Sequence, residues 1–471
     1  MKRLGMRATA AVLIAAGVLA LGGCEEPATF RQHRIIDPAP STQGGEAAGE
    51  SAPKNDAKNQ PVEITDSSTL NNYLAYAALN NPALEAAFER WKAAMAAIPQ
   101  ARSLADPQFT FQYFVVPQAM RDGDWRFTYE LTQAFPWFGK LQLQGDMADK
   151  EAQAAFARYE QQRLNLFASV KAAYYEYQYL TRAVAITQEN LQTLGSIEAI
   201  ARSRYETSGG NQADVIRSQV ELGKLENELA SMKDMLVPIG ARLNAALGRA
   251  ADAPLPKTLP AGAEVEAAPD EAQLLAWAAK ASPDLQALAF DIDKQRTGID
   301  LARTSYFPDF MLGVELDQMT QAPGFTSTPP NPIAVMASLN IPIWWEKYAA
   351  AVRQANANYA AAVGQRKDRL NSLASEIKME AFNFRNAARK AALYRDVLVP
   401  KATTSLKSTQ ASYQTGASGF TDFVETQRTL LEFQLSQERA ISDRQQALAR
   451  LEALVGRSAA TTTHPATKPA G

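Results

Sequence analysis

Cysteine and histidine are almost absent from this chain of 471 residues. The single cysteine is Cys24, and the two histidines, His33 and His464, lie in tail-like segments near the two ends. This composition argues against disulfides, thiol catalysis, zinc clusters and most histidine-based acid–base chemistry. Asp and Glu are plentiful, but they form no compact constellation in the sequence. We therefore expect no enzymatic activity, no catalytic residue, no metal site and no cofactor held by the fold.

An excess of basic charge is also missing. Lys and Arg number 48 and Asp and Glu number 50, so the net charge is −2. The sequence has no long run of Lys or Arg that would attract a polyanion. We therefore expect no nucleic-acid partner.

The N-terminus lacks an apolar run long enough for a membrane span, but it has the parts of a secretory signal. Lys2 and Arg3 begin a basic region, and the short apolar segment Ala8–Leu21 follows it. Two glycines then supply the small residues that precede a cleavage site. Residues 1–23 are therefore predicted to be a signal peptide.

Cys24 lies where this signal would be cut. The sequence Leu-Gly-Gly-Cys looks like a bacterial lipobox, in which the cysteine is acylated and becomes the mature N-terminus. The alternative is an ordinary signal peptide with a coincidental cysteine. We expect a lipoprotein with a diacylglycerol and an acyl chain, such as palmitate, on Cys24 inserted in membrane lipid. Glu25, and not an aspartate, follows the cysteine. In this respect the chain resembles bacterial lipoproteins that are sent to the outer membrane.

The sequence between the two ends repeats itself. Matched residues occur in the same order in both halves: Ala77-Ala78 with Ala278-Ala279, Pro82 with Pro283, Pro107 with Pro308, Tyr205 with Tyr413, Asp214 with Asp422, and Gly248-Arg249 with Gly456-Arg457. Ordered matches over most of the chain indicate a duplicated fold. The predicted parts are a flexible leader over 24–67, a first repeat over 68–252, a proline-rich linker over 253–269, a second repeat over 270–457 and a disordered tail over 458–471.

Both repeats have the same order of predicted elements. An alanine-rich helix, over 68–102 and again over 270–303, precedes two strands in which apolar and polar residues alternate. The apolar positions are Phe109, Phe111 and Tyr113; Trp125, Phe127, Tyr129 and Leu131; Phe310, Leu312, Val314 and Leu316; and Ile333, Val335, Ala337, Leu339 and Ile341. We therefore predict four strands, each with one apolar side and one polar side.

Proline is absent between Trp137 and Val237, which favours very long helices after the strands. A single helix over 141–205 would be about 95 Å long at 1.5 Å per residue. A turn is predicted at Ser208–Asn211, and in the second repeat a kink at Pro400 and a turn at Gly416–Gly419. A coiled-coil seam at heptad spacing is predicted to contain Val170, Tyr174, Tyr177, Val184 and Leu191.

The four strands raise the question of membrane insertion. In hydrocarbon, strands can cross a membrane only as a closed barrel, because every backbone polar group must be paired. Four strands cannot close around a lumen, so an open duct would require several chains, and geometry alone permits more than one copy number. The alternative is a soluble antiparallel sheet with its apolar face turned inward.

Two doubled signatures then indicate a family. They are the strand exit Leu131–Lys140 with its diverged twin Leu339–Lys347, and the turn Tyr205–Gly209 with Asp214 and its counterpart Tyr413–Gly416 with Asp422. With the duplicated unit, they make the chain closely similar to the TolC-like outer-membrane factor family, in its lipoprotein branch. The similarity extends from about Thr69 to Arg457.

The resemblance implies an α+β fold that is mainly α. It would have a long α-helical coiled-coil barrel, with four strands per chain contributing to a shared trimeric transmembrane β-barrel. It also implies a homotrimer in the outer membrane, lipid-anchored, whose helical barrel extends into the periplasm. The expected function is a passive exit duct of a tripartite efflux or type I secretion system, gated at its periplasmic tip. A periplasmic adaptor (membrane fusion) protein and an inner-membrane pump would be its partners.

The resemblance places a gate at the two helix turns. Asp422 and Glu425 are one helical turn apart, so threefold symmetry would stack them as acidic rings, and the family has acidic residues at matching positions in its constricted tip. The family's basic partner in this turn is replaced by Ser418. Arg217, which aligns with Glu425, is predicted to supply a cross-repeat ion pair instead, and Asp214 aligns with Asp422. The alternative is that these carboxylates only favour the start of a helix.

The same turns are implied to receive the adaptor. The predicted docking residues are Tyr205, Gly209, Gly210, Tyr413, Gly416 and Gly419. The glycines are most simply explained as residues that permit tight turns. A lipid-anchored periplasmic coiled-coil scaffold or adaptor is the alternative function. It would share the anchor and the long helices, but it gives no reason for four alternating strands at matching positions.

Overall fold

The computed structural model describes residues 64–65, 67–120, 123–207, 209–260, 270–320, 330–415 and 417–457. The predicted signal peptide, Cys24, most of the leader, most of the linker and the tail lie outside these residues. In the first repeat the elements are α2 (Leu70–Asn80), α3 (Pro82–Arg102), β1 (Gln108–Met120), β2 (Gly123–Phe135), α4 (Lys140–Glu206) and α5 (Gln212–Leu247). In the second they are α6 (Glu271–Ala281), α7 (Pro283–Thr304), β3 (Phe310–Thr320), β4 (Ile333–Leu339), α8 (Trp345–Leu393), the π-helical turn η2 (Tyr394–Leu398), α9 (Val399–Thr415) and α10 (Phe420–Val455).

The first helix predicted in each repeat is in fact two helices, so that prediction was wrong in its continuity. The breaks lie at Asn81 and Ser282, each directly before a proline that begins the next helix. The Asn81 side chain accepts hydrogen bonds from the backbone N–H groups of Ala83 (2.9 Å) and Leu84 (3.2 Å), and thereby caps α3. Proline disfavours a helical residue before it and suits the first helical position. The duplicated proline therefore explains both breaks.

The duplication is repeated in three dimensions at two glycines. Gly248 ends α5 and Gly456 ends α10, with φ of +75° and +79°. A Cβ atom at Gly248 would lie 2.6 Å from the carbonyl oxygen of Asn80, and one at Gly456 would lie 2.5 Å from that of Ala281. Each glycine therefore serves both the left-handed helix end and the close packing of that end against the break between the two short helices.

The very long helices predicted after the strands are confirmed. Helix α4 has 67 residues without a break, which corresponds to about 100 Å at 1.5 Å per residue. In the second repeat the irregularity precedes Pro400, in the π-helical turn Tyr394–Leu398. Because Pro400 has no N–H to donate, the helix loses a regular hydrogen bond one turn earlier, where the turn widens. The first repeat has no counterpart of η2 among its described residues.

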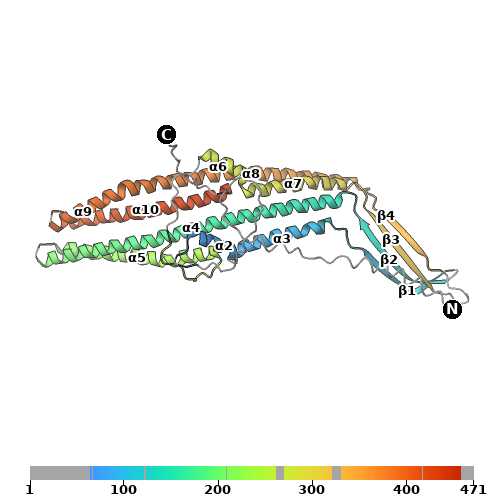
Figure 1. Ribbon diagram of the computed structural model, residues 1–471, viewed down its shortest axis with the longest axis horizontal. Helices are drawn as coiled ribbons and strands as arrows, with labels where there is room; N and C mark the ends of the chain where they lie inside the picture. The colour runs from blue at the N-terminus through green and yellow to red at the C-terminus, as the bar shows by residue number, and fades with distance from the viewer. Residues whose placement is uncertain are drawn as a thin grey trace, which may run out of the picture. The chain divides into compact units, whose positions relative to one another are not determined.

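Helix α4 is the central element of the helical packing. It packs against α2, α3, α5, α7 and α10, and α8 packs against α7 and α10. Figure 1 shows the sheet at one end of α4 and the α4–α5 turn at its other end. The predicted seam is correct at Val170, Tyr174 and Tyr177 but shifts by one residue beyond them. The buried positions there are Ala183, Thr187, Asn190, Leu194, Ile197 and Ala201, whereas Val184 and Leu191 are half-buried.

The four strands form one antiparallel sheet in the order β1-β2-β3-β4. Directly opposed residues share a face. One face has the aromatic and aliphatic rows Phe109–Leu131–Val314–Val335 and Phe111–Tyr129–Leu316–Ile333. The other has the polar rows Gln108–Thr132, Thr110–Glu130–Glu315 and Gln112–Thr128–Asp317. The predicted two-sided sheet is therefore confirmed for these rows, but the prediction was wrong for two residues. Ile341 lies beyond the end of β4, and Trp125 lies beyond a register shift in β2 that moves it off the apolar face.

The apolar face of the sheet is not covered by the part of the chain that the structure describes. Phe109 is 67% exposed, Ile333 70% and Val335 81%. All three clusters of buried residues are formed by residues outside the four strands. Strands β1 and β4 each pair with only one described strand, so the sheet has two free edges. A separate finding concerns the helices: none of those described is both long and apolar enough to cross a membrane.

Asp309 holds the junction between strands and helices together. Its carboxylate accepts hydrogen bonds from the backbone N–H of Trp137 and from Lys140 Nζ, both at 2.8 Å. Its own N–H donates to Asn340 Oδ1 at 2.5 Å. Burial favours the neutral acid, but the hydrogen bonds from Lys140 and Trp137 prevail and hold the pKa of Asp309 below its ordinary value. Asp309 thus ties the exit of β2 and the start of α4 together through its carboxylate, and it binds the exit of β4 through its backbone N–H.

Candidate functional site

The ends of the two long helical hairpins carry the predicted functional residues. The hairpins are α4–α5 and α9–α10, and a cluster of buried residues joins them beneath their turns. Ile197 of α4 and Phe423 of α10 are completely buried in this cluster, and Phe420 is 2% exposed. Packing of this kind places the two turns of one chain side by side. Residues from both repeats can therefore act on each other there.

The duplicated tyrosines have opposite environments. Tyr413 is 3% exposed, with its ring 5.9 Å from that of Phe420 and 6.3 Å from that of Phe423. Tyr205 is 45% exposed. In the first repeat, Gln212 occupies the position that matches Phe420, so the aromatic partner is missing. Of the two predicted docking tyrosines, only Tyr205 therefore presents its ring at the surface.

Arg204 binds the two turns to each other. Its Nη1 donates to the carbonyl oxygen of Tyr413 at 2.5 Å, and its Nη2 donates to that of Gly209 at 3.4 Å. The guanidinium also lies 5.2 Å from the centre of the Tyr413 ring. Burial and the nearby Asp214 carboxylate raise the pKa of Tyr413, against the opposing effect of Arg204. These residues surround a polar cavity of about 420 Å³ that is also lined by Gly210 and Ser418.

Asp422 and Glu425 lie on a different side of the tip. Both are exposed, and both line a groove of about 380 Å³ between α9 and α10, together with Lys401 and Phe433. The alignment of Asp214 with Asp422 thus does not translate into equivalent surroundings. Asp214 faces the cavity between the two hairpins, whereas Asp422 faces the groove within the second hairpin. The Gly419 N–H lies 3.4 Å from the Asp422 carboxylate, which also suits a helix start.

Arg217 reaches across the repeats but does not pair with Glu425 among the described residues. Its Nη1 donates instead to Thr421 Oγ1 at 3.0 Å. The reason is geometric, because Thr421 lies on the side of α10 that faces α5, while Glu425 lies toward α9. Of the predicted docking glycines, Gly209, Gly210 and Gly419 lie in the described turns, and Gly416 lies outside the described residues.

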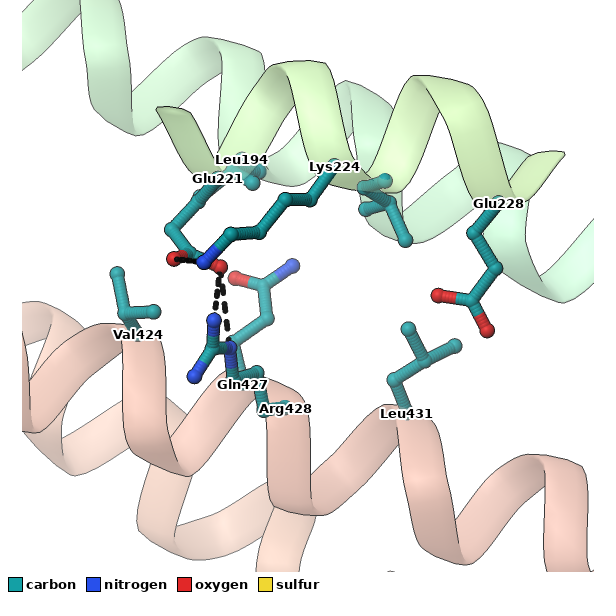
Figure 2. A pocket seen from close by; sticks show the side chains of 9 residues that line it. Leu194, Glu221, Lys224, Glu228, Val424, Gln427, Arg428 and Leu431 are labelled. Carbon is teal, nitrogen blue, oxygen red and sulfur yellow. Dashed lines mark hydrogen bonds and ion pairs between the residues drawn. The ribbon is translucent and has the colours of Figure 1, made fainter. Parts of the chain in front are cut away.

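The structure instead shows an ion pair between the hairpins at Glu221 and Arg428 (Figure 2). Arg428 Nε donates to Glu221 Oε2 at 3.0 Å, and Arg428 Nη2 contacts the same oxygen. Lys224 Nζ donates to the other carboxylate oxygen at 3.0 Å. We call these three residues the clasp. They border a cavity of about 190 Å³ with apolar walls from Leu194, Val424 and Leu431.

Electrostatics favour the ionised form of the clasp. Burial alone would raise the pKa of Glu221, but the hydrogen bonds from Lys224 and Arg428 outweigh it and lower the pKa. Sequence reasoning missed this site. Glu221 aligns with Thr429 and Arg428 with Val220, so the repeat pattern contains no signal for it.

Comparison with known proteins identifies both the sequence pattern and the fold. A family model described as outer membrane efflux protein matches residues 74–249 and 274–457. The outer membrane protein VceC of Vibrio cholerae is 19% identical, with a TM-score of 0.69, covering 83% of this chain and 96% of VceC. The Campylobacter jejuni CmeC outer membrane channel is 14% identical, with a TM-score of 0.71 and coverages of 91% and 96%.

A third solved structure, the open state of the Neisseria gonorrhoeae MtrE outer membrane channel, is 18% identical with a TM-score of 0.68. It covers 89% of this chain and 98% of MtrE. At these identities the solved structures establish the fold, which is the TolC-like arrangement predicted from the sequence. A comparison with curated protein sequences finds no match.

Proposed function

Because the chain belongs to the outer membrane efflux protein family, we propose that three copies of it form the exit duct of a tripartite efflux or type I secretion system. Membership in this family makes it an outer-membrane channel for efflux. The proposal adds the homotrimer, the gate, the lipid anchor and the partners. An inner-membrane pump would supply the energy, and a periplasmic adaptor would join the pump to the duct.

The observation that carries the proposal is the uncovered sheet. Its apolar face is exposed, its opposite face is polar, and both of its edges are free among the described residues. In water, such a sheet would expose a large apolar patch and two edge strands whose unpaired N–H and C=O groups favour aggregation. In a bilayer, edge-to-edge pairing of copies would give the backbone N–H and C=O groups of the edge strands hydrogen-bond partners and put the apolar face against lipid. Three chains with four strands each would enclose a water-filled lumen.

The helix tips supply the second element of the proposal. Tyr205 is exposed beside the turn of the first hairpin and is available to an adaptor. Asp422 and Glu425 are exposed one helical turn apart on the second hairpin. In three copies they would form two stacked acidic rings that narrow the duct and favour cations. Asp214 and Arg217 would hold the neighbouring turns, through the polar cavity and through Thr421 respectively.

The function is tested by single-channel conductance of the purified, detergent-extracted protein in planar bilayers. We expect discrete, cation-preferring steps, and a larger conductance with reduced cation preference for the double variant Asp422→Asn, Glu425→Gln. Removing six negative charges from the rings of a trimer would weaken the electrostatic selection of cations. If the step conductance and the cation preference are the same in the double variant as in the wild type, the channel is retained and the acidic gate is rejected. Absence of conductance in both proteins would reject the trimeric duct proposed here.

A lipid anchor on Cys24 is a separate prediction. The lipobox-like sequence before Cys24 motivates it. We expect labelled palmitate to be incorporated into the wild-type protein and not into the Cys24→Ser variant, because the diacylglycerol is attached through the Cys24 thiol, which serine lacks. Mass spectrometry of the mature N-terminus should find acylated Cys24 as the first residue. A free amino terminus at any other residue would refute the anchor and leave the channel proposal intact.

A further inference from the structure

Trp125 does not lie on the face of the sheet where the alternation of the sequence places it. Alternation puts Trp125 together with Phe127 on the apolar face. In the structure, Phe127 is opposite Gln318 and Trp125 is opposite Met319. Two steps along β2 thus correspond to one step along β3, and Arg126 is the extra residue of a β-bulge. A bulge of one residue reverses the face of every residue beyond it, so Trp125 lies on the polar face.

Contacts of the indole confirm this reversal. Trp125 Nε1 donates to Thr128 Oγ1 at 3.1 Å, and Thr128 Oγ1 donates to Asp317 Oδ1 at 2.6 Å. Thr128 and Asp317 are opposed residues of the polar face. In a regular strand, residues three apart point to opposite sides, so the first of these bonds requires the bulge. Phe127, by contrast, remains on the apolar face, with its ring 5.2 Å from that of Tyr113.

The indole is held in place on two sides. The ring of Phe114 lies 5.6 Å from that of Trp125 at an interplanar angle of 48°. The indole N–H is satisfied by Thr128, which is 6% exposed and is itself bound to Asp317. An aromatic ring whose polar atom is paired and whose face is packed loses little further freedom when it narrows a passage. Trp125 is two residues from the start of β2, at the end of the sheet opposite the helices.

We propose that Trp125, supported by Phe114, forms an aromatic collar in the lumen near the outer end of the β-barrel and limits the size of the solutes that leave. The inference rests on the proposed trimer, in which the polar face lines the lumen. Twelve strands about 4.8 Å apart and tilted by about 40° enclose a ring of roughly 12 Å radius at the backbone. Three indoles and three phenyl rings at one level occupy a large part of that opening. The collar is a second constriction, at the far end of the duct from the helix tips.

The position of Trp125 is tested first by thiol accessibility. The only native cysteine is Cys24, so Trp125→Cys and Phe127→Cys each add one reporter whose signal is read against the wild type. A charged, membrane-impermeant methanethiosulfonate is added to the assembled protein in lipid vesicles. We expect Trp125→Cys to react at least about tenfold faster than Phe127→Cys, because a thiol in lipid is neither ionised nor reached by the reagent. Equal rates, or the reverse order, would overturn the inference.

The sieving role is tested by polymer exclusion in planar bilayers. Neutral polyethylene glycols of graded size are added on the outer side only, so that polymers that pass the collar fill the lumen beneath it and lower the conductance. We expect Trp125→Ala to shift the exclusion limit to larger polymers. Thr128→Val, which removes the acceptor of the indole N–H, should produce a smaller shift. Phe127→Ala, the matched control on the lipid face, should leave the limit unchanged.

The outcomes separate this inference from the function on which it rests. Absence of conductance in both the wild type and the Asp422→Asn, Glu425→Gln variant would overturn the proposed trimeric duct and the collar together. Wild-type conductance with the same exclusion limit in Trp125→Ala would retain the channel and reject the collar. If Trp125→Ala fails to give heat-resistant oligomers, two other measurements decide whether the collar exists. They are the smaller shift of the exclusion limit expected for Thr128→Val and the reaction rates of the Trp125→Cys and Phe127→Cys variants.

Discussion

Replacing Val335 by arginine should abolish assembly of the protein in the outer membrane. Val335 is 81% exposed within the chain and lies in a row of apolar residues with Phe109, Leu131 and Val314. In the proposed barrel this row faces lipid, and Val314 and Val335 lie near the middle of β3 and β4. A basic residue at the bilayer midplane of a β-barrel costs about 2–4 kcal/mol, and each trimer would contain three of them. This combined cost is comparable to the stability of a typical domain.

The neighbouring residue provides the matched control. Ala334 lies opposite Glu315 on the polar face and is also exposed, so Ala334→Arg adds the same charge one residue away. We expect Ala334→Arg to assemble normally, because its side chain would enter the aqueous lumen near a carboxylate. The measurement is the fraction of protein recovered from outer membranes as heat-resistant oligomers. Equal recovery of both variants would contradict the assignment of the two faces and with it the barrel.

Breaking the clasp should open the helix tips. The ion pair between Glu221 and Arg428 joins the first hairpin to the second, so separation of the hairpins must break it. Because Arg428 is 58% exposed at its side chain, one pair contributes only about 0.5–1 kcal/mol. Three pairs that break together would shift the opening equilibrium on the order of 10- to 100-fold. We therefore expect a much higher open probability for Arg428→Ala in single-channel recordings.

The control for the clasp is an ion pair of similar exposure within one helix. Arg202 is 56% exposed and pairs with Glu198 four residues earlier in α4. Arg202→Ala removes a comparable surface charge without removing a bond between hairpins, so its open probability should match the wild type. A double variant Glu221→Ala, Arg428→Ala should open no further than either single variant, because both remove the same bond. Additive effects would show that the two residues act separately.

The same clasp predicts an acid response of known sign. The pKa of Glu221 is lowered in the fold, so the clasp is complete above the ordinary glutamate range of about 4.3 and is lost only as the pH falls through the lower value. Wild-type open probability should therefore stay constant from neutral pH down to about pH 4.5 and rise below it. In Arg428→Ala this acid-induced rise should be largely absent. A rise near neutral pH would contradict a clasp in which Glu221 is stabilised as a carboxylate.

The pattern of residues within single segments was sufficient to predict the strands and the long helices. The alternation in residues 310–317 predicted a two-sided strand, and the absence of proline after Pro136 predicted the long helix α4. Both signals arise within one element, where the geometry of the backbone decides which residues share a side. The site was less accessible to such reasoning. Asp214, Asp422 and Glu425 lie at the tips as expected, but their partners could not be read from spacing.

The sequence by itself determined the duplication, the two-sided strands, the long helices and the family. Only the tertiary structure decided which residues meet. It placed Trp125 on the polar face, directed Arg217 to Thr421 and brought Glu221 to Arg428. The physical reason is that periodicity is a property of one segment, whereas a bulge or an ion pair depends on the register between two segments far apart in the chain. A shift of one residue in that register moves the residues beyond it to the opposite face of the sheet, and neither the composition nor the repeat pattern of the sequence indicates such a shift.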